Sequence, residues 1–239
     1  PAPRAALQTT KNAPELAPTD PQQDTVVDGL LQLMGQAKKD LLIVSPYFVP
    51  GPDMKQAFAA ARARGVRVRV LTNSLASNDA PIAHAGYARH RPELLATGLE
   101  LYEMRSELSG LRSVFQGTGS SGVTGSSGDS KAMLHSKLLI LDGRLLVIGS
   151  MNLDLRSQLQ NTEIALLIRS RSLSARATEQ IEAALEDAAW RVEQDSEGRL
   201  VWRAPKDSGL KDATAEPDTS APLRWLVRIL GSFAPDHLL

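Results

Sequence analysis

The sequence contains no cysteine, which excludes a disulfide framework, a thiol nucleophile and a zinc site built from cysteines. It also lacks an excess of charge of either sign, because Lys and Arg together number 27 and so do Asp and Glu. A neutral chain is not expected to offer its whole surface to a polyanion, although a local basic site is compatible with neutrality.

Long hydrophobic runs are missing as well. No apolar run reaches the roughly 18 residues of a membrane-spanning helix, and no basic segment followed by an apolar one marks a signal peptide at the start. The first residue is Pro1 and not methionine, so we expect the chain to be a processed or cloned piece of something longer.

The 239 residues have room for one or two domains, and the pattern along them predicts one domain with two irregular ends. Residues 1–22 carry five prolines and are predicted to be a linker or extended arm without regular structure. Residues 23–195 are predicted to form the domain. Residues 196–239 are predicted to be a C-terminal extension, polar at first and ending in an amphipathic helix near 223–230.

Helical and strand patterns alternate in the first part of the domain. Helical spacing of apolar residues predicts helices over 25–39, 53–64 and 79–97. Short apolar or alternating runs predict strands over 41–44, 66–70 and 99–102. This alternation indicates an α/β domain with a largely parallel sheet covered by helices.

The pattern changes after residue 116. Glycine and serine dominate 117–130, which predicts a mobile loop, or alternatively an engineered scar. Strands are predicted over 133–141 and 145–149, joined by Asp142-Gly143, a strong hairpin signal. A further strand over 161–168 and a long amphipathic helix over 173–193 follow.

The residues that carry chemistry begin with His135 and Lys137, which are two apart on the predicted strand and therefore share a face. An imidazole beside an ammonium group, directly after a flexible loop, is unusual for a core strand. A surface His and Lys on an edge strand is the alternative explanation.

Further polar residues follow where the next strand ends. Ser150 and Asn152 alternate with apolar residues there, and Glu163 stands at the start of the following strand, so these groups are expected to converge at one rim of the sheet. A neutral His nitrogen can attack phosphorus or accept a proton, and a carboxylate can hold its tautomer. Lys and Asn can neutralise charge that develops on phosphate oxygens. No His and carboxylate cluster has metal-ligand spacing, so chemistry without a metal or cofactor is expected.

At these residues the sequence resembles the phospholipase D superfamily. The shared signature stands here as His135-x-Lys137-x4-Asp142, then Gly149-Ser150-Met151-Asn152, then Glu163. The resemblance implies a three-layer α/β/α domain whose central mixed sheet is flanked by helices. It also implies that His135 is the nucleophile that forms a phosphohistidine, that Lys137 and Asn152 bind phosphate oxygens, that Ser150 lines the same pocket, and that Glu163 hydrogen-bonds the far nitrogen of His135.

Residues 45–51, 65–75 and 84–87 resemble the cardiolipin synthase branch, which implies phosphatidyl transfer between phospholipids. The expected partners are then an anionic phospholipid and the headgroup alcohol of another lipid, at the periphery of a bacterial membrane and otherwise in the cytoplasm. A nuclease of the same superfamily is the rival enzyme, although nucleic acid is the less favoured substrate. A half-domain that only binds lipid or a partner is the rival without catalysis.

Enzymes of this superfamily use two His-x-Lys motifs, and this chain departs from that pattern. The other histidines are His84, His90 and His237, and none is followed by Lys two positions later. The chain therefore carries half of a site. We expect it either to be the C-terminal half of a longer enzyme or to pair with itself.

Some candidates are weaker. Asn73, His84 and Tyr87 are candidate substrate-binding residues, with ordinary packing as the alternative for the last two. Asp142 and Asp154 are assigned structural roles, and for Asp142 the reason is its turn position. For two further segments, contact with lipid competes with an ordinary structural explanation. For the arginines at 62, 64, 67 and 69, a solvated helix end and strand is favoured over a lipid-facing patch. For the C-terminal helix, with Trp225 and Phe233 as anchors, packing on the domain competes with a place in the membrane interface.

Overall fold

The structure, a computed structural model, describes residues 4–10, 26–106, 133–154, 157 and 163–233. A nine-stranded sheet runs through these residues in the order β1-β9-β7-β6-β2-β4-β5-β10-β11, and β3 and β8 form a separate pair. The strands are β1 (Arg4–Thr10), β2 (Asp40–Val44), β3 (Phe48–Val49), β4 (Arg67–Asn73), β5 (Glu100–Met104), β6 (Leu138–Leu141), β7 (Leu145–Gly149), β8 (Leu153–Asp154), β9 (Glu163–Arg169), β10 (Ala189–Gln194) and β11 (Leu200–Arg203). The helices are α1 (Val26–Gln36), α2 (Pro52–Ala63), α3 (Pro81–Ala96), α5 (Arg171–Asp187) and α6 (Ala221–Phe233).

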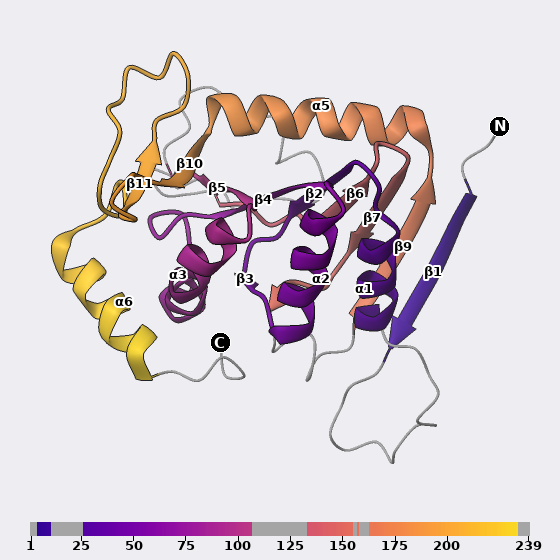
Figure 1. Cartoon of the computed structure of the whole chain (residues 1–239), viewed down its shortest axis with the longest axis horizontal. Coiled ribbons are helices and arrows are strands. Elements are labelled where there is room, and N and C mark those ends of the chain that lie inside the picture. The colour runs from indigo at the N-terminus through magenta and orange to yellow at the C-terminus, as the bar shows by residue number, and fades with distance from the viewer. Residues whose placement is uncertain (1–3, 11–25, 107–132, 155–156, 158–162, 234–239) are drawn as a thin grey trace, which may run out of the picture.

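Helices cover both faces of the large sheet (Figure 1). Helices α1, α2 and α3 lie on one face, where Val68 and Val70 of β4 join their core. Helix α5 lies on the other face, where Leu71 packs in a second core with Ile181 of that helix. Because successive side chains of a strand point to opposite faces, one strand feeds both cores. The three-layer α/β/α architecture is therefore confirmed.

The sheet is mixed. Strand β2 pairs with β4 in parallel, and β4 pairs with β5 in parallel, whereas every other pairing within the large sheet is antiparallel. Within the large sheet, parallel pairing is thus confined to the segment in which helices and strands alternate. The expectation of a largely parallel sheet is wrong, and the mixed sheet that the resemblance implies is confirmed.

A tight turn reverses the chain between β6 and β7. Asp142 and Gly143 have φ angles of 50° and 59°, which are left-handed values that suit Asp and Gly. The predicted Asp-Gly hairpin is confirmed, and it places the segment before β6 beside the segment after β7.

Four segments differ from the sequence-based predictions. Residues 133–137 are not part of strand β6, the long helix ends at Asp187 and is followed by β10, and β11 lies in the predicted polar tail. Residues 4–10, expected to lack regular structure, pair with β9 as an edge strand. Strands β1 and β10 pair with β9 and β5, which are far away in the sequence and which local patterns do not reveal, whereas β11 pairs with the preceding strand β10. The glycine-rich segment 117–130 lies outside the described residues.

Arg69 departs from the polar face that the alternating pattern predicts for its strand. It is 4% exposed, and its guanidinium contacts Asp40 and Glu182 at 3.0 and 2.8 Å. The polar face predicted for residues 66–70 is therefore partly covered by helix α5, since Glu182 belongs to that helix. Within the described part of the chain, no helix combines the length and the apolar character needed to cross a membrane.

Candidate active site

Three neighbouring strand ends bring the signature residues together. Strands β6, β7 and β9 are adjacent in the sheet. The backbone N–H of Gly149 donates to the carbonyl of Lys137 at 3.1 Å, and the N–H of Ser150 donates to the carbonyl of Ile164 at 3.0 Å. Lys137, Ser150 and Glu163 therefore meet at one rim, as the sequence predicts.

Glu163 and Ser150 are in direct polar contact at this rim. The Ser150 hydroxyl donates to Oε2 of Glu163 and accepts the backbone N–H of Ile164 at 3.0 Å. Glu163 is 6% exposed, so its carboxylate needs such a donor. Between described residues, no hydrogen bond joins Glu163 to His135, and the expected contact with the ring of His135 stays a prediction.

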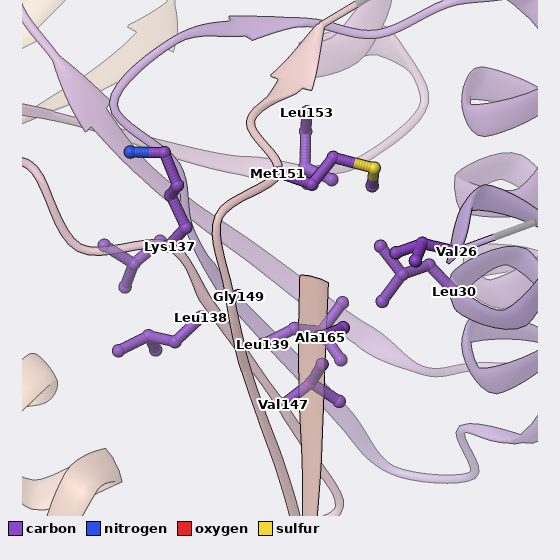
Figure 2. A pocket seen from close by; sticks show the side chains of 11 residues that line it. Val26, Leu30, Lys137, Leu138, Leu139, Val147, Gly149, Met151, Leu153 and Ala165 are labelled. Atoms are coloured by element: carbon purple, nitrogen blue, oxygen red, sulfur yellow. The ribbon is translucent and has the colours of Figure 1, made fainter. Parts of the chain in front are cut away.

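Lys137 is half-buried between a polar and an apolar environment. Burial lowers the pKa of its ammonium group, and the negative charges of Glu163 and Asp154 oppose that shift. Nζ donates to the backbone carbonyl of His135 at 3.0 Å. The stem borders a small apolar pocket of about 30 Å³ formed with residues that include Val26 and Leu30 of α1 (Figure 2). A phosphate beside this ammonium group would counter the penalty that burial imposes on its charge.

His135 lies just before β6, and its side chain is exposed. The residue before it, Leu134, is held by the side-chain amide of Asn73. Nδ2 of Asn73 donates to the carbonyl of Leu134 at 3.1 Å, and Oδ1 accepts the N–H of Leu134 at 2.9 Å. Asn73 is 1% exposed and also donates to the carbonyl of Pro46 at 3.3 Å. In the structure Asn73 therefore holds the backbone of the residue before His135. The sequence had suggested that Asn73 binds substrate.

Asn152 contributes a polar group that the rest of the described chain does not satisfy. Its Oδ1 is buried and has no hydrogen-bond partner there. A buried acceptor without a partner costs free energy, so Oδ1 would suit a ligand group that donates a hydrogen bond, while Nδ2 is the atom that could donate to a phosphate oxygen.

Tyr47 is a neighbour of Asn152 that sequence reasoning missed. Strand β3 pairs with β8 in the register Phe48 to Leu153, which places Tyr47 alongside Asn152. The Tyr47 hydroxyl donates to Asp79 at 2.5 Å, and burial together with that carboxylate raises the pKa of Tyr47 to about 12. Tyr47 stands in the segment 45–51 that carries the resemblance, and the sequence pattern assigns it no role.

Asp142 has a structural role, as assigned from its turn position. Its Oδ1 accepts the backbone N–H groups of Lys38, Lys39 and Asp40 at 3.1, 2.8 and 3.2 Å. Burial would raise the pKa of Asp142, but these donors outweigh it and keep that pKa below its ordinary value. Asp142 thus fastens the β6–β7 turn to the start of β2.

Asp154 is also placed inside the fold. It is buried, it accepts the N–H of Ser157 at 2.6 Å, and its strand β8 pairs with β3. Its negative charge raises the pKa of both Lys137 and Tyr47. Asp154 therefore affects the electrostatics of the rim as well as its structure.

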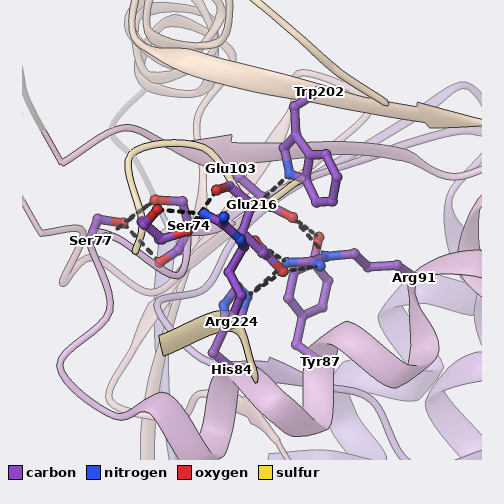
Figure 3. A network of polar contacts seen from close by, with 10 residues as sticks. Ser74, Ser77, His84, Tyr87, Arg91, Glu103, Trp202, Glu216 and Arg224 are labelled. Carbon is purple, nitrogen blue, oxygen red and sulfur yellow. Dashed lines mark hydrogen bonds and ion pairs between the residues drawn. The ribbon is translucent and has the colours of Figure 1, made fainter. Parts of the chain in front are cut away.

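His84 and Tyr87 lie in a different place, a buried polar network of α3 (Figure 3). Nε2 of His84 is 3.2 Å from Oε1 of Glu216, and the Tyr87 hydroxyl donates to Glu103 at 3.1 Å. Their exposed fractions are 1% and 2%, so both side chains are packed inside the domain and do not reach a lipid headgroup. The alternative of ordinary packing therefore holds for these two residues. Three members of this network, Arg91, Glu103 and Glu216, were not predicted, because the ion pairs that join them link residues 12 or more positions apart in the sequence.

Comparison with known proteins gives a consistent picture. Residues 30–185 match the family described as cardiolipin synthase, PLD-like domain. The chain is 38% identical to cardiolipin synthase C of Escherichia coli (strain K12) over 214 residues, which cover 88% of this chain and 43% of that protein. It is 30% identical over 146 residues to cardiolipin synthase A of Pectobacterium carotovorum, covering 61% of this chain and 24% of that protein. The chain spans less than half of the length of these curated relatives.

Solved structures share the fold at low sequence identity. Phosphatidylserine synthase of Haemophilus influenzae aligns with a TM-score of 0.63 at 16% identity, covering 99% of this chain and 47% of that chain. Nuc, a phospholipase D family member from Salmonella typhimurium, aligns with a TM-score of 0.53 at 18% identity, covering 81% and 100% respectively. At these identities the two structures support the architecture alone.

Proposed function

The chain belongs to the phospholipase D superfamily, in its cardiolipin synthase-like branch, and we propose that it supplies one half-site for phosphatidyl transfer or hydrolysis on phospholipids. The relatives support phosphodiester chemistry of the phospholipase D type as the general class of reaction. The observation that carries the finer proposal is the meeting of Lys137, Ser150 and Glu163 at three neighbouring strand ends, next to the exposed His135.

In the proposed first step, a neutral ring nitrogen of His135 attacks the phosphorus of a phospholipid. A nitrogen–phosphorus bond forms, the bond between phosphorus and the leaving alcohol breaks, and the leaving oxygen takes up a proton. In the second step, the hydroxyl of another lipid headgroup loses a proton and attacks the same phosphorus, which releases His135. Water in place of that hydroxyl gives hydrolysis.

The neighbouring side chains have distinct proposed roles. Lys137 and Asn152 bind the non-bridging phosphate oxygens, whose charge compensates for the burial of the Lys137 ammonium group. Ser150 lines the same place. Glu163, buried beside Lys137, orients the far ring nitrogen of His135.

The proton for the leaving oxygen comes, in this proposal, from a second His-x-Lys motif. The sequence contains one such motif, and the relatives are more than twice as long as the matched part. The partner motif is supplied either by another half of a longer protein or by a second copy of this chain. The substrate partners are an anionic phospholipid and a headgroup alcohol, met by peripheral contact with a bacterial membrane.

The central experiment incubates the chain, together with a chain that bears the second His-x-Lys motif, with phosphatidylglycerol and phosphatidylethanolamine and analyses the lipid products. The wild type and His135→Ala are compared, with His90→Ala as a matched control, because His90 lies on α3 against Lys55 and Glu93. We expect lipid products that His135→Ala abolishes and His90→Ala retains. Cleavage of nucleic acid without any lipid product would instead identify a nuclease.

The half-site is tested by the dependence of turnover on chain concentration. If two copies form one site, the rate per chain rises with concentration and follows the dimer fraction measured by analytical ultracentrifugation. When a chain that bears the second motif is added, the rate per chain should no longer depend on self-association of this chain. A monomer that turns over as fast as a two-motif relative would contradict the half-site proposal.

A further inference from the structure

Two strands that carry no signature residue also end at the rim of the proposed active site. Strand β2 lies between β4 and β6, and its last residue, Val44, pairs with Leu138 at the start of β6. Strand β4 runs parallel to β2, so it ends at the same rim. The chain that leaves β2 leads to Tyr47, and the chain that leaves β4 leads to Asp79. Both residues therefore follow the edge of the sheet at which Lys137 precedes β6.

The backbone beside Tyr47 is tied to the backbone beside the proposed nucleophile. The side-chain amide of Asn73 donates to the carbonyl of Pro46 at 3.3 Å and to the carbonyl of Leu134 at 3.1 Å. One buried amide thus joins the residue before Tyr47 to the residue before His135. Tyr47 is therefore a neighbour of the groups that the proposed reaction uses.

The Tyr47 hydroxyl holds one carboxylate at this rim. It donates to Oδ1 of Asp79 at 2.5 Å, and burial together with that carboxylate raises the pKa of Tyr47 to about 12. The hydroxyl therefore keeps its proton at neutral pH and remains a donor. A carboxylate has about four acceptor positions on its two oxygens. Because Asp79 is exposed and this hydrogen bond uses one position, its carboxylate can also accept a donor from a ligand.

A second acceptor lies beside this pair. The pairing of β3 with β8 places Tyr47 alongside Asn152, whose Oδ1 is buried and has no hydrogen-bond partner among the described residues. The negative charge of Asp79 disfavours a phosphate, whereas the ammonium group of Lys137 attracts one. The rim therefore combines a cationic place, which suits phosphate, with acceptor oxygens that suit the donor groups of an alcohol.

We propose that Asp79, held by Tyr47, binds the headgroup alcohol through a second donor group of that alcohol, a hydroxyl or an ammonium, while its reacting hydroxyl attacks phosphorus. The inference rests on the proposed function and names the part of the alcohol that is recognised. The second donor takes no part in bond making, so Asp79 determines specificity and Tyr47 positions Asp79. An alcohol without the second donor loses this hydrogen bond and reacts less often.

A competition between alcohols tests the inference. The chain, together with a chain that bears the second His-x-Lys motif, receives phosphatidylglycerol and equal concentrations of n-propanol, trimethylene glycol and propanolamine. These alcohols have the same carbon chain and end in a methyl, a hydroxyl and an ammonium group. Mass spectrometry quantifies the lipid product of each. Since all products come from one intermediate, their ratio reports recognition of the alcohol and not the amount of folded protein.

We expect trimethylene glycol or propanolamine to be incorporated about tenfold more than n-propanol, and the better of the two identifies the recognised donor. Asp79→Asn should reduce this preference to about twofold, because the amide lacks the charge that strengthens the hydrogen bond. Tyr47→Phe should reduce the preference as well, because the carboxylate is no longer held.

The matched controls change the same groups elsewhere. Tyr102→Phe removes a hydroxyl that donates to Glu100 at 3.2 Å, at the opposite end of the sheet from the rim. Asp207→Asn removes an exposed carboxylate after the edge strand β11, at a φ of 54° that Asn also adopts. Both should leave the product ratio unchanged.

The outcomes separate this inference from the proposed function. Equal incorporation of the three alcohols by the wild type, a preference that survives in Asp79→Asn and Tyr47→Phe, or equal losses in the controls would overturn the inference and leave the proposed function standing. Absence of every lipid product with the second motif present would overturn the proposed function, and the inference would fall with it.

Discussion

At the scale of single residues, Asn73 shows how a buried amide can position a reactive group that it does not touch. Its side chain pairs with both backbone groups of Leu134, and Ser77 donates to its Oδ1 at 3.3 Å. Because Leu134 precedes His135, the amide restricts the backbone from which the proposed nucleophile projects. We infer that Asn73 is a positioning residue and not a catalytic one.

Asn73→Asp should lower the rate of the proposed reaction at least tenfold while the chain stays folded. The carboxylate keeps the acceptor for the N–H of Leu134, but its second oxygen faces the carbonyls of Leu134 and Pro46 and repels them. Reaction of His135 with diethyl pyrocarbonate, followed by mass spectrometry, measures the change in the reactivity of the imidazole independently of substrate.

Asn78→Asp is the matched control, since Oδ1 of Asn78 accepts the N–H of Ala80 at 2.8 Å and an aspartate keeps that bond. It should leave both the rate and the His135 labelling unchanged. If Asn73→Asp lowers the melting temperature but alters neither measurement, Asn73 has only a structural role.

At the scale of elements, the end of β7 explains why glycine precedes Ser150. A Cβ atom at Gly149 would lie 2.7 Å from the carbonyl oxygen of Ile164, which belongs to the neighbouring strand β9. That carbonyl accepts the N–H of Ser150, so the close approach of the two strands and the placement of Ser150 beside Glu163 depend on each other.

Gly149→Ala should destabilise the chain by about 1–3 kcal/mol, the usual cost of forcing extra atoms into a packed position. It should also reduce activity, because β7 and β9 must move apart at the rim. Gly35→Ala in α1 is the control. Nothing lies within 4 Å of a Cβ atom at that position, so alanine there should be neutral or stabilise the helix by about 0.5–1 kcal/mol. Urea unfolding measures both, and equal stability of the two variants would contradict the steric argument.

At the scale of the whole molecule, one buried network connects distant parts of the chain. Arg91 of α3 contacts Glu103 of β5 and Glu216 of the segment before α6, and Trp202 of β11 donates to Glu103. Burial would raise the pKa of Glu216, but the charge of Arg91 and the hydrogen bond from His84 lower it to about 2. The C-terminal part is therefore held to the central sheet by ion pairs inside the fold.

Glu216→Gln should destabilise the chain by about 3 kcal/mol, because it leaves the charge of Arg91 buried with one compensating carboxylate fewer. For a chain of this length the melting temperature should fall by roughly 6–12 °C at pH 7. Glu197→Gln, which breaks an exposed pair with Arg199, should change stability by less than about 1 kcal/mol.

The stability difference between wild type and Glu216→Gln should also depend on pH. The pKa of Glu216 is lower in the folded chain than its ordinary value of 4.5, so its contribution to stability is complete above that value. The contribution disappears as the pH falls from about 4.5 towards about 2. The gap in melting temperature between wild type and Glu216→Gln should therefore be widest near neutral pH and close over that range. A gap that is constant from pH 7 to pH 3 would contradict the ionised network.

The sequence by itself determined the family signature, the helices α1 to α3, the turn at Asp142 and the meeting of Lys137, Ser150 and Glu163. These features depend on local periodicity, on a short turn, or on strand ends that a hairpin must bring together. Only the tertiary structure decided that Asn73 holds Leu134, that His84 and Tyr87 are buried, and that Tyr47 lies beside Asn152. It also decided the pairing of β1 with β9 and of β10 with β5. The reason is physical: backbone pairing between remote strands and ion pairs between buried groups become visible only when the chain has brought their partners into contact.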